Sequence, residues 1–199
     1  MTIKRGDDWG TAVARPADGV VATTDADVAR LVTSGDARPV VVAGGDLHHT
    51  VGAPPPGDTA LRLPLDLLHV DAGGTTYTAV AHVVLRRPGP VGWWRGPLVA
   101  AMNAEFVGAW DVAPRAHPND GRFDAVVVDE AMSVRERWQA RGRLPTGAHV
   151  PHPAISVTRQ TEAGFTFDRP LAVFVDGVRR ADATAVTIRI EPDAATVYV

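Results

Sequence analysis

Residues 110–128 read WDVAPRAHPNDGRFDAVVV, a dense turn that leads directly into an apolar segment. Pro, Asn, Asp and Gly each favour a bent backbone for a different reason, so residues 117–121 predict a tight loop. The apolar and β-branched residues 123–128 predict a buried strand. Such a loop can direct carbonyl groups and the Asp120 carboxylate at a hard cation. The same Asn-Asp-Gly sequence is typical of a simple strand connection, and both interpretations stay open.

The composition indicates a globular protein of one domain or two small ones. The chain has 199 residues, of which 45% are hydrophobic and 22% charged, so it can bury a core. Its net charge of −3 argues against a nucleic-acid partner. The absence of cysteine excludes disulfides and thiolate metal sites. Residues 1–8 lack the apolar core of a signal peptide, and no apolar run approaches the roughly 20 residues of a membrane span. We therefore expect a cytoplasmic protein without a transmembrane segment.

Residues 1–53 predict a small α/β unit. An apolar run at residues 19–22 is followed by Thr24, an N-cap residue that forms a capping box with Asp27. Gly35 is placed to end this helix. The apolar residues 39–43 then predict a buried strand, so the order is strand, helix, strand and turn.

A Pro-rich connector at residues 53–57 is the best candidate for a domain boundary. Beyond it, residues 58–199 show many short strand patterns separated by turns, which predicts a β-sandwich domain. One helix interrupts them, since Ser133 and Glu136 form a second capping box, and Val134, Trp138 and Leu144 could face inward. The fold class expected is α+β, mostly β: a small N-terminal βαβ-like unit followed by an antiparallel β-sandwich with one or two helices. Strands are expected at residues 61–70, 77–87, 97–106, 123–128, 154–160, 164–167, 171–175, 185–190 and 196–199.

Two polar or aromatic groups in the second part could line a ligand cleft. Trp93 and Trp94 precede a strand and could rim an apolar cleft, with Arg95 supplying charge for a head group or phosphate. Alternatively, one ring belongs to the core and the other covers it. Asn103 and Glu105 interrupt an apolar strand at alternate positions, so they share one face, which is either solvent-exposed or part of a cleft.

Two short motifs follow predicted strands and could carry chemistry. Gly44, Gly45 and Asp46 lie at the carboxyl end of a buried strand, where glycines allow backbone N–H groups to approach phosphate oxygens. A tight turn explains the same triplet, and the GK[ST] of a P-loop is absent. Asp176 and Gly177 fit a type I′ hairpin turn. An Asp at a strand end could also orient a base or a metal-bound water.

The histidines offer a further metal-site hypothesis. His149 and His152 are three residues apart, and a zinc cluster built from them would need a third ligand such as His117. The surrounding sequence lacks a recurring ligand spacing, so exposed loop histidines are the alternative.

Several of these motifs occur in one order that resembles a known family. The order is the Gly-Gly-Asp triplet, the APxxxPxDGxxD segment of residues 113–124, the GxHxxHP segment of residues 147–153 and the Val-Asp-Gly of residues 175–177. This resembles the bacterial diacylglycerol kinase family, the relatives of sphingosine kinase. The resemblance is best over residues 102–199, which correspond to the β domain of the family.

The resemblance implies specific roles for matched residues. In that family a Gly-Gly-Asp-Gly-Thr loop binds ATP, which implies Gly44, Gly45 and Asp46 as ATP-binding residues, although Leu47 and His48 replace the last two positions. The family's Pro-x-x-Asp-Gly loop holds a structural Mg²⁺, which implies the Asp120 carboxylate and the carbonyls of His117 and Arg122 as ligands.

The family's catalytic loop is Asp-Gly-Glu, and here Val178 replaces the glutamate that accepts the proton. The resemblance therefore leaves Asp176 as the candidate catalytic residue.

Two functions follow as hypotheses. The first is a lipid-kinase-like protein whose ancestral chemistry is phosphoryl transfer from Mg-ATP to a lipid hydroxyl, weak or inactive here because of Leu47, His48 and Val178. The second is a non-enzymatic binding module for a lipid-like or small acidic ligand or a protein partner. An exposed edge strand could also pair two copies into a homodimer.

Overall fold

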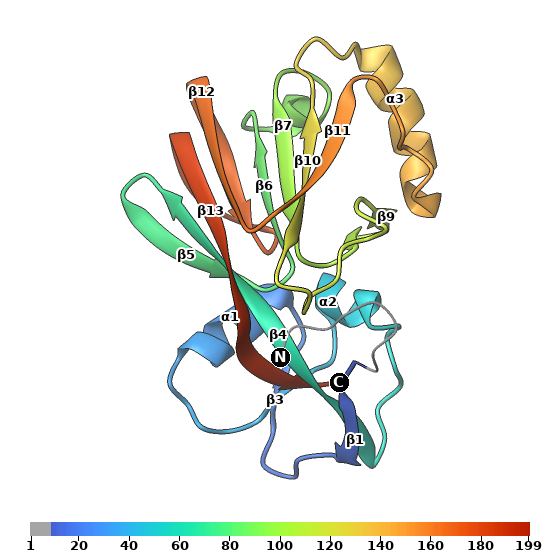
Figure 1. Ribbon diagram of the computed structural model, residues 1–199, viewed down its shortest axis with the longest axis vertical. Helices are drawn as coiled ribbons and strands as arrows, with labels where there is room; N and C mark the ends of the chain where they lie inside the picture. Colours follow the sequence, from blue (N-terminus) through green and yellow to red (C-terminus); the bar gives the residue numbers. More distant parts are fainter. Residues whose placement is uncertain (1–8) are drawn as a thin grey trace.

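The computed structural model describes residues 9–199, so residues 1–8, in which no signal peptide is expected, lie outside the described part. An 11-stranded sheet dominates the described chain. Eight of its strands follow the order β1-β4-β13-β12-β6-β7-β10-β11, and β2, β3 and β5 pair beside this path. Every neighbouring pair along this order is antiparallel. The α+β, mostly β fold class predicted from the sequence is confirmed. In Figure 1, β6, β7, β10 and β11 form the upper part and α3 lies beside them, whereas α1, α2, β1 and β3 gather below.

The N-terminal unit contains β1 (Thr11–Ala14), β2 (Val20–Ala22), α1 (Asp25–Thr33), β3 (Val40–Val42) and α2 (Gly45–Thr50). The Thr24 hydroxyl caps α1 by accepting the Asp27 N–H, and Gly35 follows the helix with a φ of 75°, as the sequence predicts. The strands β2 and β3 are parallel, and β3 also pairs in parallel with the end of β13. This pairing joins the unit to the main sheet. The domain boundary near residue 53 stays a prediction.

Three long strands organise the rest: β4 (Thr59–Ala72), β12 (Glu162–Val175) and β13 (Val178–Tyr198). A hairpin joins β12 to β13 through Asp176 and Gly177, whose φ values of 48° and 77° are both positive, as a type I′ turn requires. The expected breaks at residues 168–170 and 191–195 are irregularities within continuous strands. In both places the antiparallel pairing resumes after the irregularity, so the turn-forming residues interrupt the register without ending the strand.

Two expected strands are instead shorter than predicted. The segment 77–87 divides into β5 (Thr75–Ala79) and β6 (His82–Arg86), and β7 (Leu98–Met102) ends before Asn103. Asn103 is fully buried and donates hydrogen bonds to the carbonyls of Asp66 (3.0 Å) and Val80 (2.8 Å). Asn103 therefore connects the end of β7 to β4 and to the residue after β5. It neither faces solvent nor lines a cleft, so both interpretations made from the sequence are wrong for this residue.

The remaining elements are the end strands β10 and β11 of the sheet order and the short segments around them. They are η1 (Pro90–Trp93), β8 (Phe106–Val107), β9 (Trp110–Asp111), β10 (Phe123–Val128), α3 (Val134–Arg143), η2 (Leu144–Thr146) and β11 (Ile155–Gln160). The bounds of β10 and the capping box of Ser133 and Glu136 confirm the prediction. Val134 and Trp138 do not face inward, because they are 41% and 66% exposed, and α3 buries Arg137 instead.

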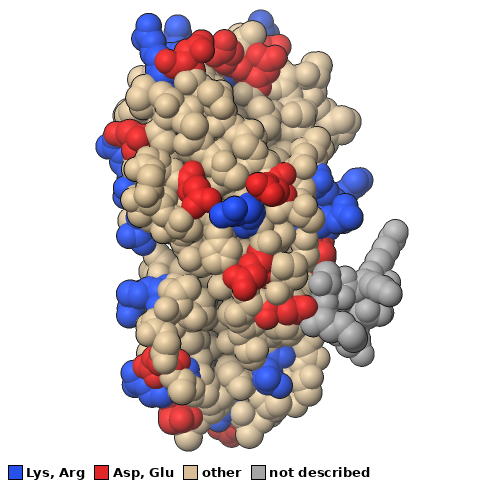
Figure 2. All heavy atoms as spheres, turned by 60° about the vertical axis from the view of Figure 1, so that its left-hand side comes forward, with Lys and Arg blue, Asp and Glu red and all other residues tan. Residues whose placement is uncertain are grey.

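The buried apolar residues form a main core, a second core and a smaller third cluster that includes Val84, Met102 and Val126. The main core packs side chains such as Leu85, Phe123 and Ile188 from the curved sheet. The second packs the N-terminal unit against the start of β4 and the end of β13, through residues such as Leu47 and Val197. Acidic and basic side chains of the described residues are interspersed on the face in Figure 2. Within residues 9–199, no helix has the length and apolar character needed to cross a membrane.

Candidate functional site

The Gly-Gly-Asp triplet, which forms the N-terminus of α2 instead of a simple turn, and the Asp176 hairpin meet at His82, at the start of β6. Asp46 places Oδ2 2.8 Å from Nε2 of His82. Asp176 accepts the backbone N–H of His82 at 3.1 Å. Residues that are 130 positions apart in the chain (176 − 46) are therefore linked through one histidine. The structure brings together two of the motifs that the sequence singled out.

The N-terminus of α2 holds the Asp25 carboxylate. Asp25 accepts the N–H of Asp46 at 2.7 Å and the N–H of Leu47 at 3.0 Å. These are backbone donors of the kind that bind phosphate at a helix N-terminus. Gly45 has a φ of 91°, and a Cβ there would lie 2.5 Å from an Asp25 oxygen. The close approach of Asp25 thus explains the glycine locally, and the role of Gly44, Gly45 and Asp46 in ATP binding stays a prediction.

Three carboxylates and one imidazole share this buried region. Burial raises the pKa of Asp25 to about 6, although the two backbone hydrogen bonds oppose the rise. Burial also raises the pKa of Asp176, against the opposing effect of His82. Burial alone would lower the pKa of His82, but the hydrogen bond to Asp46 and the nearby carboxylates raise it overall.

Asp176 fixes the break between β5 and β6. Its carboxylate, 8% exposed, accepts the N–H groups of Val80 (2.9 Å), Ala81 (2.9 Å) and His82 (3.1 Å). Val178 is 40% exposed and supplies no proton acceptor beside it. These contacts give Asp176 a structural role, while its catalytic role stays a prediction.

The loop of residues 117–121 has internal partners for its polar groups. The Asp120 carboxylate accepts the Arg122 N–H at 3.0 Å and pairs with the Arg159 guanidinium. Nδ1 of His117 accepts the Asn119 N–H at 3.2 Å. A cation at Asp120 would compete with Arg159, and the Mg²⁺ site of Asp120, His117 and Arg122 stays a prediction.

Asp66, on β4, binds the same loop through hydrogen bonds, and it was not predicted from the sequence. It is fully buried and accepts the N–H groups of Gly121 (2.7 Å) and Asp193 (2.8 Å) and the Asn119 amide (3.2 Å). Burial raises its pKa, although these hydrogen bonds oppose the rise. A lone aspartate inside the apolar run of residues 60–68 was the signal that could have revealed it.

Asp124, on β10, gives a pH-dependent prediction. It is 3% exposed, and burial raises its pKa from 3.8 to about 6. Between these pH values the folded state holds more protons than the unfolded state, so Asp124 reduces stability as pH rises through this window. Asp124→Asn should therefore increase the free energy of unfolding by about 1–3 kcal/mol at pH 8 and have little effect near pH 3.5.

Urea unfolding at both pH values measures this difference, with exposed Asp168→Asn as the control. An equal effect of Asp124→Asn at both pH values would contradict the assignment.

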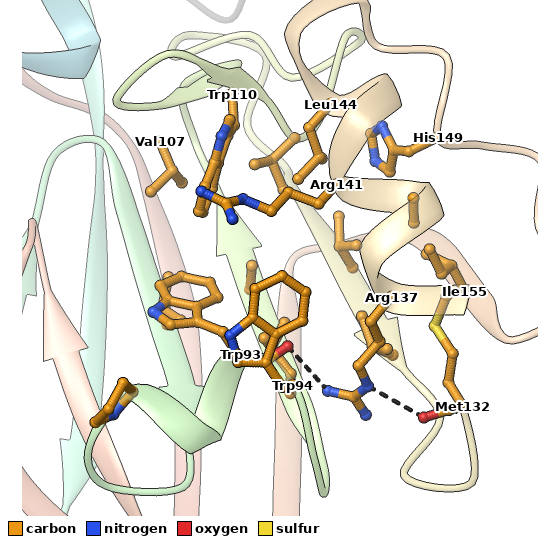
Figure 3. A pocket seen from close by; sticks show the side chains of 18 residues that line it. Trp93, Trp94, Val107, Trp110, Met132, Arg137, Arg141, Leu144, His149 and Ile155 are labelled. Atoms are coloured by element: carbon orange, nitrogen blue, oxygen red, sulfur yellow. Dashed lines mark hydrogen bonds between the residues drawn. The ribbon is translucent and has the colours of Figure 1, made fainter. Parts of the chain in front are cut away.

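An apolar cavity of about 230 Å³ lies between the sheet and α3. Trp93, Trp94, Trp110, Arg137, Arg141 and His149 are among its lining residues (Figure 3). Both Trp93 and Trp94 border this cavity, which agrees with the cleft interpretation, and Trp93 also packs against a buried apolar cluster, which agrees with the alternative that one ring belongs to the core. Arg95 does not line this cavity, and Arg137 and Arg141 provide the positive charge instead.

The two arginines of the cavity differ in their surroundings. Arg137 is 5% exposed and donates to the carbonyls of Met132 (3.3 Å) and Asp129 (3.0 Å), and no carboxylate among residues 9–199 pairs with it. Arg141 lies over the rings of Trp94 and Trp110, at 5.5 and 5.4 Å from their centroids. Burial lowers the pKa of His149, although a backbone hydrogen bond with Val112 and the nearby Asp111 oppose the shift. The cavity thus combines aromatic walls with unneutralised positive charge.

The zinc cluster of His117, His149 and His152 is not formed. Within the part of the chain that the structure describes, the cluster of potential metal-ligating groups is Asp25, Asp46 and His82. His149 lines the cavity, whereas His117 packs edge-on against Trp9. His117 lies in the loop before β10, whereas His149 and His152 lie in the segment between η2 and β11.

A comparison with protein families gives one match. The model of the YegS C-terminal NAD kinase beta sandwich-like domain matches residues 74–199, which is more than half of the chain. The chain belongs to this family. The YegS C-terminal domain contains His82, the cavity and Asp176, whereas Asp25 and Asp46 precede the matched region. A comparison with curated proteins finds no match.

Solved structures support the same fold. A candidate diacylglycerol kinase from Bacillus anthracis str. Sterne superposes with a TM-score of 0.67 at 12% identity, covering 90% of this chain and 77% of the other. A diacylglycerol kinase from the same organism gives a TM-score of 0.62 at 14% identity, covering 90% and 75%. At these identities the likeness concerns the fold. It places the YegS C-terminal domain of this chain within the lipid-kinase-like fold.

Proposed function

We propose that this lipid-kinase-like protein binds a single-chain, anionic lipid-like ligand in its apolar cavity and transfers phosphate weakly or not at all. The observation that carries the proposal is an aromatic cavity that contains positive charge without a carboxylate partner. An acyl chain would contact the tryptophan rings, and an acidic head group would lie near Arg141. Family membership and structural relatives named diacylglycerol kinases support a lipid as the ligand class.

The size of the cavity favours one short chain over two long ones. Its volume is about 230 Å³, below the roughly 300–1,000 Å³ of sites for drug-sized ligands. A cavity below that range favours one medium-chain carboxylate over the two chains of a diacylglycerol.

Weak phosphoryl transfer is proposed from three local features. Asp25 occupies the N–H groups of Asp46 and Leu47, and its charge would repel phosphate. The Leu47 side chain is fully buried in the second core. It cannot move aside to make room for a phosphate unless this core repacks. Val178 supplies no proton acceptor. Phosphoryl transfer depends on positioning and charge neutralisation, and these features oppose both.

Binding is tested by titrating the protein with decanoate and following tryptophan fluorescence. We expect saturable decanoate binding, weaker binding of decylamine, and weaker binding of didecanoylglycerol. Arg141→Gln should weaken decanoate binding roughly five- to tenfold, because it removes the positive charge beside Trp94 and Trp110. Arg143→Gln, an exposed change on the same helix that does not line the cavity, is the matched control. Equal binding of decanoate and decylamine would contradict the proposed head group.

Phosphoryl transfer is tested separately, with labelled ATP, Mg²⁺ and mono- or diacylglycerol as acceptor. We expect no turnover above the protein-free background. Robust transfer that Asp176→Asn abolishes, in a variant that keeps the wild-type melting temperature, would show an active kinase. Decanoate binding without transfer supports the binding role.

A further inference from the structure

We propose that Asp25, Asp46 and His82 form a binding site for one divalent transition-metal ion of the zinc class. The three residues stand at the starts of α1, α2 and β6, and one potential ligand atom from each lies within 4.8 Å of the others. The sequence separates them by 21 and 36 positions, so tertiary folding alone brings them together. An ion there would join the N-terminal unit to the YegS C-terminal domain.

The donor set selects the kind of metal. One imidazole nitrogen with two carboxylate oxygens is a mixed set that suits Zn²⁺ and its neighbours in the first transition row. Mg²⁺ prefers oxygen ligands and retains several waters, so an imidazole ligand disfavours it. This site therefore differs in place and chemistry from the Mg²⁺ loop at Asp120.

Backbone donors hold both carboxylates in place. Asp25 is held by the N–H groups of Asp46 and Leu47, and Oδ1 of Asp46 accepts the Gly108 N–H at 2.8 Å. Oδ2 of Asp46 is thereby directed toward His82. Such outer contacts orient metal ligands before an ion binds.

His82 is a buried side chain with incomplete hydrogen bonding. It is 2% exposed, and its Nδ1 has no hydrogen-bond partner among the described residues. Most buried polar groups have a partner, so the described protein groups leave this imidazole incompletely satisfied. Its Nε2, 2.8 Å from Oδ2 of Asp46, is the ring nitrogen placed to bind an ion.

The charge of the region also favours a cation. Asp25, Asp46 and Asp176 surround one imidazole, and within residues 9–199 no Lys or Arg forms an ion pair with any of the three. Backbone N–H groups and His82 bind these carboxylates but leave three acidic groups in one buried region, and a divalent ion would offset their charge. The Asp46 side chain is 18% exposed, which provides a route from solvent.

The test uses untagged full-length protein freed of metal with a chelator. Titration with Zn²⁺ should show one saturable site by calorimetry, and Co²⁺ should give visible absorption bands at one equivalent. Zn²⁺ at about 100 times its Kd should raise the melting temperature by on the order of 5–10 °C. Asp46→Asn and His82→Gln should each weaken binding at least tenfold, because changing even the outer partners of metal ligands typically costs about 10–100-fold.

The matched control is His69→Gln, because His69 pairs with Glu191 at 2.6 Å on the surface without a third ligand. Binding that survives His69→Gln but not the two site variants supports the site. Binding that survives both Asp46→Asn and His82→Gln, or that disappears in His69→Gln, overturns it. Circular dichroism in chelator confirms that each variant folds. If a variant unfolds, absence of one-equivalent Zn²⁺ or Co²⁺ binding by the wild-type protein still overturns the proposal.

Discussion

Replacing Asp176 by alanine is expected to lower the free energy of unfolding by about 3–5 kcal/mol. The carboxylate is 8% exposed and accepts the N–H groups of Val80, Ala81 and His82. Removing it leaves three backbone donors in a buried position without an acceptor. Alanine also fits poorly at a φ of 48°, where Asp is tolerated more easily. The loss should appear as a lower urea midpoint.

Asp182→Ala is the matched control for this prediction. Asp182 lies on β13 a few residues beyond the hairpin, but it is exposed and pairs with Arg179 on the surface. Its removal should cost at most about 1 kcal/mol. If Asp176→Ala lowers the urea midpoint no more than Asp182→Ala does, the proposed structural role of Asp176 is wrong.

Asp66→Ala is expected to cost about 3–4 kcal/mol, for a related reason. Asp66 is fully buried and joins three parts of the chain: its own strand β4, the loop at Gly121 and the β13 irregularity at Asp193. Alanine would orphan the donors of both loops and leave a small cavity. The structural consequence should be local loosening, measured as faster amide hydrogen exchange at Gly121 and Asp193.

Asp71→Ala tests the specificity of that effect. Asp71 lies on the same strand, but it is partly exposed and contacts Arg189 and Thr76 at the surface. We expect a loss within about 1 kcal/mol and unchanged exchange at Gly121. Faster exchange at Gly121 in Asp71→Ala would show that β4 as a whole, rather than Asp66, controls the loop.

The features predicted well from sequence are those that neighbouring residues determine. The loop before β10, the two capping boxes and the Asp176 hairpin depend on residues within a few positions of one another. The lengths of β12 and β13 were not predicted, because whether pairing continues past an irregularity depends on the partner strand.

The sequence by itself determined the fold class, the family resemblance, the turn motifs and the tryptophans of the cavity. The tertiary structure alone decided which side chains meet: Asp25 reaches α2, His82 joins Asp46, and Asp66 holds a loop more than fifty positions away. It also decided that Arg137, rather than Arg95, lies beside the cavity. The physical reason is that burial and hydrogen bonding between distant segments depend on the packing of the whole sheet, whereas turns and caps depend on local backbone preferences.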